Sequence, residues 1–292
     1  MAALGAAVSV GTLAVSGCSE ADTAPPVATV SFTPSKTRLA MGSPVQLTYK
    51  FEVAPDATIP GDYRVFMHVK NPDGATLWTD DHDPPTPTSS WRAGQTVEYT
   101  RRRFVPKYAY VGDATVEIGL HRDNERLALQ GPNPADREST SRSYTVGRLQ
   151  LLPESENIFL IFKSGWHPPE FSPEDSSIDW QWTQKTATLT FRNPRADINL
   201  YIEYDARPDL FSDRPQQVTV YSGQQAVYTF AADAGAPKLE IVQITGDQLG
   251  PNELAELRIE VDRTFVPARL PAGGRDAREL GIRVYHAFVE GR

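Results

Sequence analysis

Residues 45–53 read Val-Gln-Leu-Thr-Tyr-Lys-Phe-Glu-Val, with an apolar or aromatic side chain at every second position. Side chains alternate between the two faces of a β-strand, so this stretch predicts a strand with one buried and one wet face. Similar runs occur at 63–69, 96–104 and 115–121, and turn sequences rich in Pro, Gly, Asn and Asp separate them. This spacing predicts an immunoglobulin-like β-sandwich over residues 27–147.

A second set of strand-like runs follows a pause in the pattern at residues 148–157, which we interpret as a linker. The runs lie at 158–162, 187–192, 200–204, 218–221, 226–230, 239–244, 257–261 and 282–289. Eight strands predict a jelly-roll-like sandwich over residues 158–292. We expect the two sandwiches to fold independently of each other.

Local turn chemistry refines this prediction. Ser222-Gly223 lies between two strand-like runs, and glycine supplies the positive φ that a tight hairpin turn needs. The segment 80–90 contains Pro84, Pro85 and Pro87 and is therefore expected to be an irregular loop. The one helix-like segment is 251–256.

The composition and net charge of the chain limit the classes of partner that we expect it to bind. The chain has 292 residues, 24 prolines, 20 glycines and a formal net charge of −8. Its many prolines, glycines and short β-branched runs favour strands and turns over helices. The negative charge repels phosphate backbones, and we therefore expect no nucleic-acid partner.

The first residues are typical of an export signal. Residues 1–15 are uncharged and mostly apolar, too short to span a bilayer but the right length for a signal-peptide core. The following Val15-Ser16-Gly17-Cys18 resembles the lipobox of bacterial lipoproteins, and Cys18 is the only cysteine. The resemblance implies a signal peptide at 1–17, lipid modification of Cys18, a flexible tether at 18–26, and a membrane-anchored protein of the bacterial cell envelope, periplasmic or surface-facing.

A second resemblance covers roughly residues 158–290. It is carried by Gly165-Trp166-His167, Trp180-Gln181-Trp182, Phe191-Arg192-Asn193-Pro194, Thr264-Phe265-Val266-Pro267-Ala268 and 276–282, Asp-Ala-Arg-Glu-Leu-Gly-Ile. These segments are similar to a β-sandwich module appended to bacterial envelope glycosyltransferases and found in bacterial lipoproteins of unassigned function. The resemblance implies an accessory module and transfers no catalytic residue.

Several polar segments are candidates for chemistry, and none has the spacing of a known site. Asp80-Asp81-His82-Asp83 offers oxygen ligands but lacks the alternating spacing of an EF-hand loop. The His167-Pro168-Pro169-Glu170 and Glu174-Asp175 segments could form an acid/base or metal site, yet zinc-type histidine spacing is absent. We expect no bound metal, no cofactor and no enzymatic activity.

Tryptophans form the other candidate set. Trp180 and Trp182 are two residues apart, so on a strand they point to one face, where exposed rings could stack on sugars. Trp166 could join them as a carbohydrate-binding set. The in-phase Ile178 favours a sandwich interior instead. Asp276, Arg278 and Glu279 are expected to brace a turn by charge pairing.

The leading hypothesis is a non-catalytic envelope lipoprotein that acts as a binding or assembly module, with glycan or another envelope protein as the candidate partner. The alternative is a structural adaptor that docks a membrane complex through an exposed strand edge or loop. A glycan-modifying hydrolase is the third hypothesis, because paired carboxylates from distant strands leave no local motif.

Overall fold

The computed structural model describes residues 22–292 except 108–109, 134–140, 176–177, 212 and 272–273. Cys18, the expected signal peptide and the first part of the expected tether lie outside the described residues. Within the described part, no helix is long and apolar enough to cross a membrane. Contacts divide the described residues into two compact units, one formed by the segment up to Ser35, Leu47–Arg101 and Asp113–Leu149, the other by Lys36–Gln46, Arg102–Gly112 and Gln150–Arg292.

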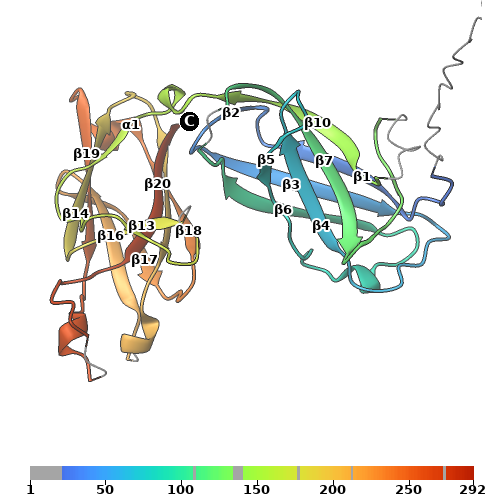
Figure 1. The fold of residues 1–292 in the computed structure, drawn as a ribbon. Coiled ribbons are helices and arrows are strands. Elements are labelled where there is room, and N and C mark those ends of the chain that lie inside the picture. The colour runs from blue at the N-terminus through green and yellow to red at the C-terminus, as the bar shows by residue number, and fades with distance from the viewer. Residues whose placement is uncertain (1–21, 108–109, 134–140, 176–177, 212, 272–273) are drawn as a thin grey trace, which may run out of the picture. The chain divides into compact units, whose positions relative to one another are not determined.

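The described residues form an all-β fold built from four sheets (Figure 1). The first sheet has the order β6-β3-β1-β9, with β1 at Ala28–Pro34, β3 at Pro44–Val53, β6 at Thr96–Phe104 and β9 at Leu129–Gln130. The second has the order β2-β10-β7-β4-β5, with β8 beside β7. Its strands are β2 at Arg38–Ala40, β4 at Arg64–Lys70, β5 at Thr76–Thr79, β7 at Gly112–Arg122, β8 at Glu125–Arg126 and β10 at Tyr144–Leu152.

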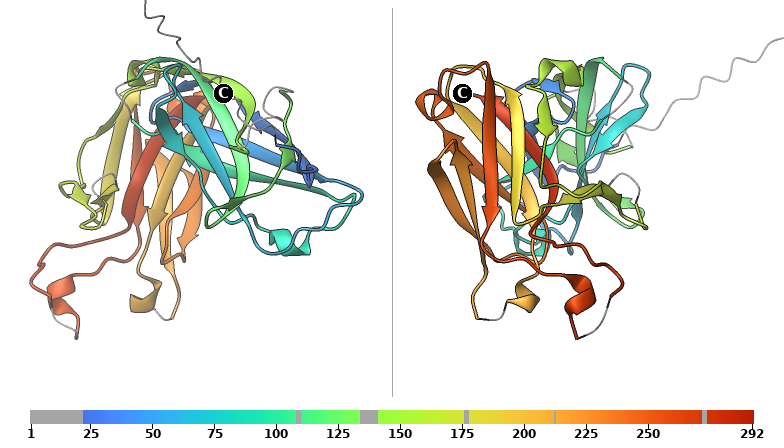
Figure 2. Two further views of the ribbon diagram at one scale, coloured as in Figure 1. Left: turned by 45° about the vertical axis from the view of Figure 1, so that its right-hand side comes forward. Right: turned by 90° about the vertical axis from the view of Figure 1, so that its left-hand side faces the viewer.

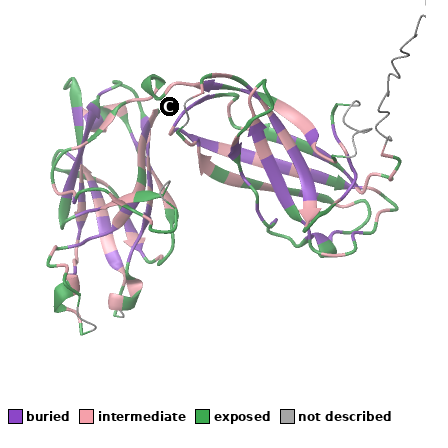
Figure 3. Cartoon of the chain, viewed as in Figure 1, coloured by how far each residue is buried: buried purple, intermediate pink, exposed green. Residues whose placement is uncertain are grey.

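The β3 strand confirms the prediction from its alternating sequence. Leu47, Tyr49 and Phe51 are fully buried, whereas Thr48 and Lys50 between them are not. The β1 strand pairs antiparallel with β3 along seven residues, so both strands direct their alternate side chains to the same core. Figure 3 shows the buried positions gathered on the strands.

The third and fourth sheets contain five strands each, as can be followed in Figures 1 and 2. The third has the order β11-β14-β19-β16-β17: β11 Leu160–Phe162, β14 Thr186–Arg192, β16 Gln216–Ser222, β17 Gln225–Ala232 and β19 Leu254–Val261. The fourth has the order β12-β13-β20-β15-β18: β12 Glu170–Phe171, β13 Asp179–Trp182, β15 Ile198–Asp205, β18 Lys238–Ile244 and β20 Arg283–Gly291.

One hydrophobic core, called the central core below, lies between these two sheets. On β15, the residues Ile198, Leu200, Ile202 and Tyr204 are all fully buried in it, while the residues between them face away. Alternate residues of β14, β16 and β19 complete the same cluster from the other sheet. This sandwich therefore has the alternation that two packed sheets require.

The turns and helices match the sequence in part. Gly223 has φ +58° and turns the β16–β17 hairpin, as predicted. The prediction of a helix at 251–256 is wrong. The β19 strand begins at Leu254, because its alternate residues Ala255 and Leu257 are buried in the core. The α-helix lies earlier, at α1 Gly246–Leu249 with a capping box from Thr245. Short 3₁₀ turns occupy Thr88–Ser90, Glu154–Glu156, Pro208–Leu210 and Pro267–Arg269.

The segment interpreted as a linker is partly strand. The β10 strand runs to Leu152, and its last three residues pair in parallel with β2. The strand expected around Trp180 and Trp182 is β13, whereas β12, which forms a short hairpin with it, was not predicted. The end of β10 pairs with β2, and β13 pairs with β20; pairing with a strand distant in sequence outweighs a weak local pattern.

Candidate functional site

The tryptophans of β13 lie on the outer face of the fourth sheet, not in the sandwich interior. In the β13–β20 register, Gln181 lies opposite Val284 and Trp182 opposite Arg283. Val284 belongs to the central core, so Trp182 faces the other way. It is only 9% exposed because it packs with Phe265 and Leu280 in a separate cluster. The expected burial is found for Trp182, but its ring is covered by loops and not by the opposite sheet.

The three candidate tryptophans do not form an exposed row. Trp180 is half-buried beside the Trp182 cluster. Trp166 packs against the central core and its indole N–H donates to the backbone oxygen of Thr188 at 2.9 Å. Ile178, in phase with Trp180, is 44% exposed. Exposure therefore increases from Trp182 towards the free end of the β12–β13 hairpin.

Arg283 lies at the centre of the aromatic side chains on this face. Its guanidinium carbon is 4.9 Å from the ring centre of Trp180, 5.6 Å from that of Trp182 and 5.2 Å from that of Tyr285. A cation at these distances is attracted to the faces of aromatic rings. We call Arg283, Trp180, Trp182, Tyr285 and Asp205 the Arg283 cluster.

Asp205 neutralises the charge of Arg283. Its side chain is 3% exposed, accepts a hydrogen bond from Arg283 Nε at 2.8 Å and another from the hydroxyl of Tyr285 at 2.8 Å. The hydrogen bond to Asp205 raises the pKa of Arg283. Burial, followed by the bond to Asp205, raises the pKa of Tyr285. Arg283 therefore stays charged and Tyr285 keeps its proton at neutral pH.

A second ion-pair network borders the Arg283 cluster. Arg278 donates to Asp276, with Nη2 2.7 Å from Oδ2, and to Glu170, with Nη1 2.7 Å from Oε1. Glu170 also accepts a hydrogen bond from the indole of Trp180 at 3.3 Å. Hydrogen bonds from Arg278 lower the pKa of the Asp276 carboxyl to about 2. The predicted pairing of Asp276 with Arg278 is confirmed, while the Glu279 side chain accepts from Thr264 instead.

The remaining acid/base candidates of this unit are held separately. His167 is buried and its Nε2 lies 2.7 Å from the backbone oxygen of Glu279. The Glu174 carboxylate accepts from the hydroxyl of Ser172 at 2.9 Å. Glu170 pairs with Arg278, so the structure does not bring these three side chains together as one reactive group.

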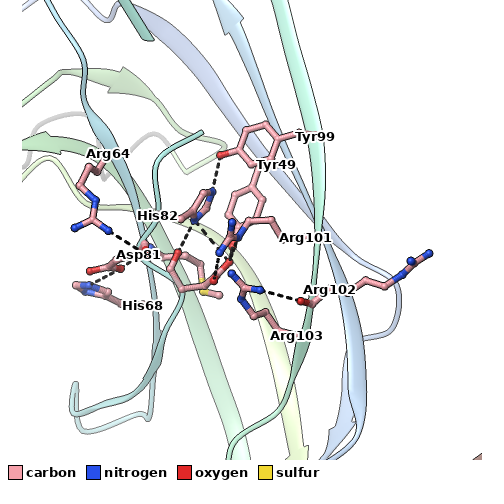
Figure 4. A network of polar contacts seen from close by, with 11 residues as sticks. Tyr49, Arg64, His68, Asp81, His82, Tyr99, Arg101, Arg102 and Arg103 are labelled. Carbon is pink, nitrogen blue, oxygen red and sulfur yellow. Dashed lines mark hydrogen bonds and ion pairs between the residues drawn. The ribbon is translucent and has the colours of Figure 1, made fainter. Parts of the chain in front are cut away.

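The acidic segment of the first unit forms part of a buried polar network, shown in Figure 4. Asp80 accepts hydrogen bonds from the Tyr49 hydroxyl and from Arg101 Nε, both at 2.8 Å. His82 Nε2 lies 2.8 Å from the hydroxyl of Tyr99. Burial and the negative charge of Asp80 raise the pKa of Tyr99. The network thus joins β3, β6 and the loop after β5.

The carboxylates of this segment do not converge. Asp81 accepts from the backbone N–H of Met67 at 3.2 Å and lies 3.5 Å from His68 Nε2, while Asp83 pairs with Arg64 at 3.3 Å. In the described part of the chain, no group of three or more His, Cys, Asp or Glu side chains could hold a metal ion. Figure 4 shows Asp81 and His82 pointing towards different partners.

Sequence reasoning missed Asp205, Arg283 and Tyr285. Arg283 and Tyr285 are two apart at the start of β20 and so share the outer face, a pattern that the sequence does contain. Asp205 is 78 positions away from Arg283, and no local motif connects them.

Comparisons with known proteins give distant likenesses only. No protein-family model and no curated protein matches the sequence. Among solved structures, a Pseudomonas fluorescens alkylpurine DNA glycosylase, AlkC, is similar at 14% identity and a TM-score of 0.27 over 43% of this chain and 30% of that chain. A Bacteroides uniformis β-glucuronidase is similar at 11% identity and a TM-score of 0.31, over 89% of this chain and 30% of that chain. The Bacillus subtilis sporulation control protein Spo0M is similar at 12% identity and a TM-score of 0.27, over 76% of this chain and 91% of that chain. The chain thus covers less than a third of the first two proteins, and at these TM-scores none of the three likenesses bears on function.

Proposed function

We propose that this protein is a non-catalytic binding module of the bacterial cell envelope, anchored through a lipid on Cys18. The β12–β13 hairpin beside the Arg283 cluster is its contact surface. The observation that carries this proposal is the exposure of two large apolar side chains on that hairpin. Phe171 is 60% exposed and Ile178 44% exposed.

The surroundings of these side chains fit a protein contact. Ile178 shares a face with Trp180, whose ring lies against Arg283, and the ion pair of Arg278 with Glu170 borders Trp180. Phe171 lies opposite Asp179 and extends the surface to the other face of the hairpin. Protein interfaces are enriched in aromatic residues and arginine at their centre and carry polar groups at their rim. The contacts of Arg283 with three rings hold the aromatic side chains in place, which reduces the entropy lost on binding.

A protein partner fits this surface better than a glycan. Sugar binding by stacking needs an open ring face, but the guanidinium of Arg283 lies against Trp180 and the Trp182 ring is buried. Glycan binding is therefore the alternative, and the variants described below test it in parallel.

The ion pairs also support a non-catalytic role. Asp205, Glu170 and Asp276 each pair with an arginine. A carboxylate acting as a nucleophile or general acid must be available to the substrate with a suitable pKa. Breaking a buried charge pair to free such a group is costly, and the carboxylate of Asp205 is buried in this way.

We expect Ile178→Ser and Phe171→Ser to reduce retention of an envelope protein by the full-length lipoprotein at least tenfold, since apolar anchors contribute most of the binding energy of an interface. The measurement is quantitative co-purification from cross-linked envelopes. Leu254→Ser is the matched control, because Leu254 is exposed to a similar degree but lies on β19 of the other sheet.

The same variants are tested in parallel on an array of envelope glycans. Glycan binding that Ile178→Ser abolishes, together with unchanged protein retention, would replace the protein partner with a sugar. Equal retention by all three variants would contradict the proposed surface altogether.

The anchor gives a separate prediction. Cys18→Ser is expected to move the protein from the membrane fraction to the soluble fraction, because it removes the thiol that a lipid would modify. Incorporation of a labelled fatty acid should occur in the wild type and disappear in the variant. A membrane-bound Cys18→Ser protein, with no label in the wild type, would disprove lipid anchoring.

A further inference from the structure

An ion pair at Asp22 attaches the start of the described chain to the first unit. Arg142 Nε donates to Asp22 Oδ2 at 2.7 Å and Arg142 Nη2 donates to Oδ1 at 3.2 Å, so the pair is bidentate. The same carboxylate accepts from the backbone N–H of Ala24 at 3.1 Å, and the Asp22 side chain is only 8% exposed. A bidentate arginine–carboxylate pair fixes geometry as well as adding attraction. Asp22 is therefore held at one place on the unit.

Arg142 is itself fixed by its surroundings. Its φ of +48° is a left-handed conformation that residues other than glycine seldom adopt. Its Nη1 donates to the backbone oxygen of Arg126, and the guanidinium of Arg126 lies 4.6 Å from the ring centre of Phe66. Arg126 Nη1 donates in turn to the backbone oxygen of Ser141 at 2.7 Å. Backbone strain persists only where the surrounding structure imposes it, so the partner of Asp22 is built into the unit.

The pair shortens the tether expected at residues 18–26. Residues 19–21 alone separate Cys18 from Asp22. Consecutive Cα atoms are about 3.8 Å apart, so the Cα atom of Asp22 lies within about 15 Å of that of Cys18. Among the described residues, backbone hydrogen bonds to the rest of the unit begin at Val27. Without the ion pair, the same chain geometry would allow a tether of about 34 Å.

Asp22 marks one end of the first unit. A shallow hollow beside the β7–β8 turn is lined by Asp22, Asn124, Glu125, Arg126 and Arg142. The β4–β7 register places Lys70 opposite Thr115, at the far end of these strands from that turn. The exposed Asp73 follows Lys70 in the β4–β5 turn. The seven residues of β4 put the two ends about 20 Å apart.

We propose that the Asp22–Arg142 pair keeps the β7–β8 end of the first unit next to the lipid bilayer. The inference rests on the proposed lipid anchor at Cys18, whose acyl chains lie in the bilayer. With a tether of about 15 Å, the Asp22 end stays within that distance of the anchor in every orientation of the unit. The Asp73 end can lie about 20 Å farther away. The bilayer therefore covers one end of the unit and not the other.

The length of the tether, rather than charge, sets this contact. Arg122 pairs with Glu125 at 2.8 Å, and Arg142 pairs with Asp22, so carboxylates neutralise two of the arginines at this end. Asp123 in the same turn is exposed. Anionic lipids attract clusters of basic side chains, whereas a zwitterionic lipid is sufficient for a contact that the tether imposes. We therefore expect the contact on vesicles of phosphatidylcholine alone.

The test uses the full-length, acylated protein in phosphatidylcholine vesicles that contain a lipid with a nitroxide quencher on its headgroup. A fluorophore is attached to Asn124→Cys or, as the matched control, to Asp73→Cys. Both positions are exposed, and the lipid on Cys18 blocks its thiol. Quenching by the headgroup nitroxide acts only at short range, so it should be at least threefold greater at position 124 than at position 73.

Variants of the tether provide the second readout. Asp22→Ala should reduce quenching at position 124 at least twofold, and Asp22→Glu, which keeps a carboxylate for Arg142, should reduce it less. A Gly-Ser spacer of about five residues between positions 20 and 21 should act like Asp22→Ala, because it lengthens the tether to the same extent without touching the pair. Lys70→Ala removes another 2.7 Å ion pair of this unit, with Glu117, and should leave the quenching unchanged.

Two results would overturn the proposal for a vesicle-bound protein. One is equal quenching at positions 124 and 73, and the other is quenching at position 124 that neither Asp22→Ala nor the spacer reduces. Cys18→Ser separates these results from a failure of the anchor. A wild-type protein that carries no lipid and binds vesicles no better than Cys18→Ser would contradict the proposed anchor, and the membrane contact with it.

Discussion

Replacing Asp205 with alanine is expected to lower the free energy of unfolding of the second unit by about 3 kcal/mol or more. The change leaves the guanidinium of Arg283 without its carboxylate and the Tyr285 hydroxyl without its acceptor. A charge that loses its partner in a largely buried position costs more than a lost surface pair, because water cannot fully replace the partner. The measurement is urea unfolding followed by circular dichroism.

The control for this prediction is Asp209→Ala. Asp209 forms the same kind of pair with Arg207, with both side chains exposed, and exposed pairs contribute little to stability. Its urea midpoint should remain close to that of the wild type. Similar losses for the two variants would contradict the role assigned to the Asp205–Arg283 pair.

Replacing Trp182 with alanine is expected to cost about 3–5 kcal/mol. Trp182 is 9% exposed and packs edge-to-face on Phe265, with ring centres 5.7 Å apart. Removing its ring leaves a cavity under the loops that carry Phe265 and Leu280. Trp180→Ala should cost clearly less, because Trp180 loses less buried area.

Urea unfolding of the two tryptophan variants shows which of the two side chains contributes more to stability. The expected order is a large loss for Trp182→Ala and a small one for Trp180→Ala. A Trp182→Ala protein as stable as the wild type would show that the Trp182 cluster is not packed as described, and that its ring is available on the surface.

The strands were predictable wherever one face alone is buried. Residues 45–53 form β3 within one residue of the expected limits, since period-two alternation in that segment has one interpretation. Gly223 likewise identified the β16–β17 turn, because a tight hairpin needs positive φ there. The short segment 251–256 was ambiguous, because its local pattern suits a helix but the burial of Ala255 and Leu257 requires a strand.

The side on which the tryptophans lie could not be predicted. The spacing of Trp180 and Trp182 fixes that they share a face, but both faces of the fourth sheet bury apolar residues, one under the other sheet and one under loops. The pairing of Asp276 with Arg278 was predictable because the two residues are close in sequence. The partnership of Asp205 with Arg283 depends on strand order, which alternation does not reveal.

The hairpin as a contact surface is tested most directly by photo-cross-linking in the intact envelope. A photoreactive phenylalanine derivative at position 178 reports only on molecules within contact distance of the hairpin. A discrete cross-linked protein is predicted at position 178 and not at Asp247, an exposed position on α1. No protein adduct at position 178, or the same adducts at both positions, would contradict the proposed binding surface.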